Sequence, residues 1–125
     1  MAQPVYPVYP SGQPMCPTVT LLASGTGDNA TATATLTGTA GLNAFITKIV
    51  GSFDSAPAAA KVLTWKDGTT VKGQRLITNS HNEDFWPPLR ISAGADTVAT
   101  LAASGGAGNV GYVYIYGWVG DSKNE

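Results

Sequence analysis

The residues best suited to acid–base or metal chemistry are few and lie in one polar segment. His81 is the only histidine of the chain, and Glu83 and Asp84 follow it closely. An imidazole beside carboxylates can bind a cation or act as a general base. A zinc site, however, needs three or four converging ligands. We therefore interpret His81 as a solvated loop residue and expect no metal site and no cofactor. A small hydrolase centred on these three residues stays as an alternative.

The other patterns that support catalysis are incomplete. Nucleophilic catalysis needs a nucleophile, a base and an orienting group, and the chain offers one histidine and no Gly-x-Ser-x-Gly elbow. The glycine-rich stretch 104–108 lacks the lysine and the following helix of a phosphate-binding loop. Carboxylate pairs of the glycosidase kind would have to be drawn from acids that stand mostly in predicted turns. We expect a protein that is not an enzyme and has no catalytic residues.

Aromatic side chains could stack on sugar rings, or they could fill a core or an interface. Burial of one large apolar side chain contributes roughly 1.5–3 kcal/mol, and Tyr and Trp are enriched where subunits meet. We favour a core or an interface and keep a carbohydrate-binding face as the alternative. The candidates for a subunit interface or a glycan face are Trp86, Tyr112, Tyr114, Tyr116 and Trp118.

Most of these aromatics belong to the longest strand-like run, residues 109–119, NVGYVYIYGWV. Side chains alternate across a strand, so one face carries the tyrosines and Trp118. The other face carries Val113, Ile115 and Val119. We predict a central strand whose aliphatic face, including Val119, lies in the core. The aromatic face either packs under a hairpin that carries Trp65 or meets a neighbouring subunit.

The remaining segments indicate an all-β domain. Asp67-Gly68 between two alternating runs predicts a tight hairpin over residues 61–77. Residues 42–53 also fit a helical period, but their β-branched content favours a strand. Residues 78–83 read as a polar loop, and two prolines exclude residues 84–91 from a central strand. With further strands at 18–24, 30–37 and 97–103, we expect a single jelly-roll-like β-sandwich over residues 18–120. A frayed tail, residues 121–125, would follow it.

The first 17 residues differ from the rest, because they contain five of the eight prolines and no charged side chain. Proline favours extended, PPII-like geometry. A mobile tail is the default for a terminus, but such tails are usually charged and poor in aromatics. We therefore favour an extended arm that docks on a partner. Its centre is the tandem Val5, Tyr6, Pro7, Val8, Tyr9, Pro10.

The low charge of the chain limits the classes of partner that it could bind. Only 12% of residues are charged, and the formal net charge is −1. Nucleic acid and anionic membranes attract basic surfaces, and the lysines and arginines here are spread singly, so we expect neither partner. Low charge is common in β-rich assembly proteins. Cys16 is the only cysteine, so no intrachain disulfide can form. Without a signal-like start or a long apolar run, we expect synthesis in the cytoplasm.

A set of motifs resembles the small β-sandwich virion proteins of tailed bacteriophages, including capsid decoration (cement) proteins. The resemblance covers about two thirds of the chain, residues 41–118, and consists of turns and strands rather than a catalytic motif. It is carried by the segments GLNAFITKI, SAPAAA, VLTWKDGTTV, DFWPPLR, AGADTVATLAASGGAGNV and YIYGW.

The resemblance implies a protein on the outer surface of the capsid, made in the bacterial host. It would bind the major capsid protein and its own copies, as a trimer rather than a dimer, and bridge capsid subunits without catalysis. It also implies an N-terminal arm on the shell, which agrees with the interpretation of residues 5–10 as a capsid-contacting arm. Another structural protein of the virion tail or fibre is the alternative.

Overall fold

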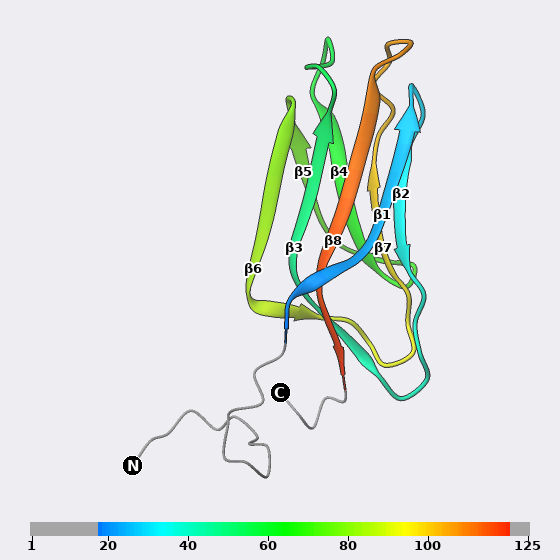
Figure 1. The fold of residues 1–125 in the computed structure, drawn as a ribbon, viewed down its shortest axis with the longest axis vertical. Coiled ribbons are helices and arrows are strands. Elements are labelled where there is room, and N and C mark those ends of the chain that lie inside the picture. Colours follow the sequence, from blue (N-terminus) through cyan, green and yellow to red (C-terminus); the bar gives the residue numbers. More distant parts are fainter. Residues whose placement is uncertain (1–17, 121–125) are drawn as a thin grey trace.

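The computed structural model describes residues 18–120, which form two antiparallel four-stranded sheets and no helix (Figure 1). One sheet has the order β1-β8-β3-β6 and the other the order β2-β7-β4-β5. The all-β class expected from the sequence is confirmed. The strands are β1 (Thr20–Asp28), β2 (Ala32–Leu36), β3 (Asn43–Phe53), β4 (Lys61–Asp67), β5 (Thr70–Ile77), β6 (Ser80–Arg90), β7 (Thr97–Leu101) and β8 (Val110–Gly120).

The core lies between the two sheets and is built from alternate positions of each strand. Its fully buried large side chains include Ile46 and Ile49 of β3, Leu63 of β4, and Val113 and Ile115 of β8. Because β8 lies between β1 and β3, the prediction that it is a central strand is confirmed. Alternation places the tyrosines of β8 on the outer surface of the sheet, where they are half-buried.

One detail of the β8 prediction is wrong, and one of its two alternatives for the aromatic face is excluded. Val119 is 41% exposed and does not lie in the core. It is on the inner face, but the lower end of β8 extends beyond the strands of the other sheet (Figure 1). Trp65 is buried in the core cluster together with Val113 and Ile115. The aromatic side of β8 is the opposite side, so it does not pack under the hairpin of Trp65.

The ambiguous segment and the hairpin have the predicted forms. Residues 43–53 are strand β3, with the burial of a strand covered on its inner face. Strands β4 and β5 pair directly across the Asp67–Thr70 turn. Gly68 has φ +61° in this turn, a left-handed conformation that glycine adopts without steric cost.

The predicted polar loop at 78–83 is wrong, because β6 already begins at Ser80. Its polar residues pair with β3, and β6 has no neighbour on its other side. An edge strand with one solvated face carries polar residues at alternate positions. The two prolines lie in this edge strand, which agrees with their predicted exclusion from a central strand.

The β1-β8-β3-β6 sheet bends sharply near its lower end (Figure 1). Extra residues interrupt the pairing at one level, namely Leu22 in β1, Thr47 in β3 and the segment 85–88 in β6. Gly117 of β8 lies at the same level, and a Cβ there would be 2.0 Å from the carbonyl oxygen of Phe45. Bulges bend strands and increase their twist. This line of bulges therefore divides the sheet into a long upper part and a short lower end.

Some predictions fall outside the described residues, namely the extended arm at 1–17 and the frayed tail at 121–125. Within residues 18–120, no helix is long and apolar enough to cross a membrane.

Candidate functional site

The outer face of the β1-β8-β3-β6 sheet carries a line of four aromatic side chains along β8. We call Tyr112, Tyr114, Tyr116 and Trp118 the aromatic row. Directly paired residues share one face of a sheet, so the register gives the flanks of the row. Small polar residues flank Tyr112 on both sides, since it lies between Thr26 and Ser52, whereas Tyr114 lies between Ser24 and Val50.

The lower part of the row is more apolar and more strongly fixed. The Trp118 ring stacks on Phe45, with centroids 5.4 Å apart and an angle of 19° between the planes. Phe45 is only 4% exposed although it lies on the outer face. The Lys48 ammonium lies 4.9 Å from the centroid of the Tyr116 ring. Such aromatic and cation–π contacts contribute roughly 0.5–1.5 kcal/mol each. The rings are therefore held in place as a rigid surface.

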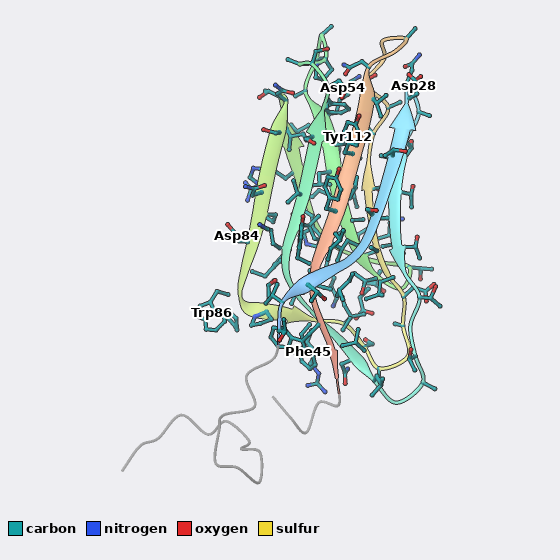
Figure 2. The ribbon with its side chains drawn as sticks, viewed as in Figure 1. Asp28, Phe45, Asp54, Asp84, Trp86 and Tyr112 are labelled. Carbon is teal, nitrogen blue, oxygen red and sulfur yellow. The ribbon has the colours of Figure 1, made fainter. Side chains whose placement is uncertain are left out.

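The upper end of the row is polar. The Tyr112 hydroxyl donates a hydrogen bond to the Asp54 carboxylate, which raises the pKa of Tyr112 above its usual value. Asp54 is positioned by its backbone N–H, which donates to the carbonyl oxygen of Val110 at 3.0 Å. Figure 2 shows Asp28 and Asp54 at this end of the sheet, with Phe45 and Trp86 at the other. The outer face thus changes from acidic and hydroxylated to apolar along its length.

Exposed apolar side chains gather at the lower end of the molecule. Six large apolar side chains are exposed among residues 18–120, and four of them come from the start of β1, the bend of β6 and the end of β8. They are Val19 (51%), Leu21 (49%), Trp86 (87%) and Val119 (41%). Leu21 pairs with Tyr116, so it extends the apolar part of the aromatic row onto β1. Trp86 projects away from the body at the bend of β6 (Figure 2).

The structure does not bring His81, Glu83 and Asp84 together as one site. Glu83 pairs with the buried Ile49 and lies on the inner side of β6, whereas Asp84 pairs with Lys48 on the outer side. The neighbours His81 and Glu83 do meet, with Nε2 2.7 Å from Oε1. Among residues 18–120, no three His, Cys, Asp or Glu side chains form a group that could hold a metal ion.

Sequence reasoning missed that Glu83 also receives two hydrogen bonds from the Arg75 guanidinium, at 3.2 and 3.4 Å. Burial raises the pKa of the Glu83 carboxyl, but the hydrogen bonds from His81 and Arg75 and their charges outweigh it, and the pKa is lowered. The signal was available in the alternation of β5 and β6. If both segments are strands, Arg75, His81 and Glu83 all face the opening between the sheets.

The predicted site residues are thus placed in two groups. Tyr112, Tyr114, Tyr116 and Trp118 form one row, and Trp86 stands apart on β6. The expected arm residues, Val5 to Pro10, lie outside the described part of the chain.

Comparisons with known proteins give no match for this chain: no protein-family model, no curated protein and no solved structure is significantly similar to it.

Proposed function

We propose that the protein is a non-enzymatic structural protein of a virion that decorates a phage head. It binds the major capsid protein on the outer surface of the shell and associates with its own copies. The observation that carries this proposal is the concentration of exposed apolar side chains at the lower end, above all Trp86 at 87% exposure. Exposed apolar groups that gather in one region mark interaction sites, and Trp is enriched at the centres of protein interfaces.

The order of the strands supports a jelly roll as the form of this sandwich. The antiparallel pairs β1–β8, β2–β7, β3–β6 and β4–β5 are those of one long hairpin rolled up along its length. Every connection crosses between the sheets except the β4–β5 hairpin. Jelly rolls with eight strands are common in viral capsid proteins but also occur in lectins and cupins. The topology therefore supports a virion protein without selecting it by itself.

The proposed mechanism is mechanical. The rigid sandwich presents its lower end to the capsid, while the arm of residues 5–10 reaches a neighbouring protein of the shell. Contacts that are weak singly become strong when several copies act together, and we favour a trimer for this reason. Few charges have to be desolvated in such an interface, since the chain has only seven Lys and Arg and eight Asp and Glu.

The proposal is tested by mixing the purified protein with capsids assembled without it and measuring co-sedimentation. We expect saturable binding that Trp86→Ser weakens by about tenfold or more, because an exposed Trp anchor is lost. Leu76→Ser is the matched control, since Leu76 is 66% exposed on the other sheet and lies far from the lower end. Absence of binding to capsids would refute the decoration function. Equal effects of the two substitutions would refute the assignment of the lower end as the capsid-binding surface.

A carbohydrate-binding module is the second candidate, and the exposure of Trp86 favours it. A flat, solvated indole is the group that stacks on a sugar ring, and the aromatic row offers further rings on the same sheet. A glycan array read by tryptophan fluorescence tests it. Quenching that Trp86→Ser abolishes would support this function, and an array without any quenching would exclude it for the glycans tested.

A further inference from the structure

We propose that the aromatic row is the docking site for residues 5–10 of a second copy of this chain. The face and the segment were separate features of the sequence, and their chemistry is complementary. This inference needs no capsid and therefore stands or falls apart from the decoration function.

The chemistry of the row suits a proline-rich ligand. Proline-rich segments in PPII form bind surfaces lined by Tyr and Trp, because proline rings pack on aromatic rings and the extended chain loses little entropy on binding. Here Ser24 of β1 lies beside Tyr114, and Leu21 of the same strand lies beside Tyr116. The hydroxyl groups of Ser24 and Thr26 can donate to the carbonyl oxygens of a PPII chain, which make no internal hydrogen bonds.

The charge and length of the segment also fit. Residues 1–17 carry no charged side chain, so the segment itself brings no ion into the interface. The charged groups beside the row, Lys48 and Asp54, already have partners in Tyr116 and Tyr112. The tandem Val5-Tyr6-Pro7-Val8-Tyr9-Pro10 spans about 19 Å as PPII at roughly 3.1 Å per residue. The row from Tyr112 to Trp118 spans six steps of a strand, or about 20 Å. One tandem therefore covers one row.

The length of the chain before β1 lets the tandem reach a neighbouring copy. β1 begins at the lower end of the sheet, so the preceding segment is attached there (Figure 1). Seven residues, 11–17, separate the tandem from the described chain and can span up to about 25 Å. This reach is enough for the tandem to lie on the row of another copy, and a mixture of variants distinguishes that arrangement from docking on the same molecule.

A complementation experiment with full-length variants tests the inference. The arm variant is Tyr6→Ser/Tyr9→Ser. The face variant is Tyr114→Thr, in which threonine replaces one residue that favours strands with another. Analytical ultracentrifugation in the presence of a reductant, which prevents crosslinks through Cys16, gives the mass over a concentration series. We expect the wild-type chain to self-associate and each variant alone to bind itself at least about tenfold more weakly.

An equimolar mixture of the two variants shows whether self-association arises from docking of the arm of one copy on the row of another. The intact arm of the face variant can bind the intact row of the arm variant, whereas neither variant alone can make such a contact. The mixture should therefore form heterodimers that are tighter than either variant alone and weaker than a wild-type dimer with two such contacts. A wild-type monomer at all concentrations, variants that associate like the wild type, or a mixture that stays monomeric would each overturn the inference. Association that appears only when capsids are added would place the arm on the capsid instead.

Two controls separate docking from folding. Leu76→Ser removes an exposed apolar side chain from the other sheet and should leave association unchanged. If thermal unfolding shows that Tyr114→Thr disturbs the fold, Ser24→Lys replaces it, because Ser24 is exposed and lies directly opposite Tyr114. The added lysine would block the row with a charge, and association unaffected by Ser24→Lys would also count against the inference.

Discussion

The Glu83 carboxylate joins two strands that belong to different sheets. Arg75 comes from β5 and Glu83 from β6, and these strands form neighbouring edges of the two sheets. The Glu83 side chain is only 17% exposed, and His81 contacts the same carboxylate oxygen as Arg75. A carboxylate that accepts hydrogen bonds, here two from the Arg75 guanidinium, is stabilised in its charged form. This contact therefore closes the open side of the sandwich with charge rather than with apolar packing.

The lowered pKa of Glu83 gives the sign of a pH dependence. The unfolded chain binds the Glu83 proton more tightly than the folded chain does. The contacts of the Glu83 carboxylate therefore stabilise the fold at pH values above 4.5, the usual pKa of the group, and this contribution is lost as pH falls through the lower pKa of the folded state. We predict that Glu83→Gln lowers the free energy of unfolding at pH 7 by roughly 0.5–1 kcal/mol. Urea unfolding should show the difference vanishing at acid pH. A double-mutant cycle with Arg75→Gln provides the control, and a difference that is independent of pH would contradict the assignment.

At the scale of elements, the bend of the β1-β8-β3-β6 sheet depends on the missing side chain of Gly117. A Cβ there would lie 2.0 Å from the Phe45 carbonyl oxygen, which is backbone and cannot swing away. We predict that Gly117→Ala destabilises the fold by about 2–4 kcal/mol, as expected of severe overpacking. Gly106→Ala is the matched control, because the nearest atom is 3.9 Å away. Equal denaturation midpoints for both variants would show that the strands can separate at the bend without cost.

The sequence predicts well the elements whose structure is determined by residues close together in the chain. Alternation identified β8, β-branched content identified β3, and Asp67-Gly68 identified the β4–β5 turn. The segment at 78–83 was missed because a polar edge strand is defined by its backbone pairing with β3, which leaves little trace in side-chain type. Val119 was predicted in the core because alternation places it on the inner face of β8. Whether the opposite sheet is long enough to cover it depends on residues far away in the sequence. The aromatic row was predicted as a set, but its flanks depend on the register of three strands.

At the scale of the whole molecule, the surface has little charge and its exposed apolar groups lie mainly at one end. The formal net charge is −1, and Trp86, Val19 and Leu21 are all close to half exposed or more. Long-range electrostatic attraction therefore contributes little to any encounter. Burial of apolar surface should drive association both with copies of this chain and with a capsid.

This distribution predicts how self-association responds to salt. Screening of charges weakens an interface held by ion pairs, whereas sulfate strengthens apolar burial because it is excluded from protein surfaces. We therefore expect the dissociation constant of the wild-type assembly to change by less than about threefold between 50 mM and 500 mM sodium chloride. An equal ionic strength of sodium sulfate should tighten it. Sedimentation equilibrium provides the measurement. Weakening by about tenfold or more in sodium chloride would mean that charged side chains hold the copies together, which the aromatic row does not provide.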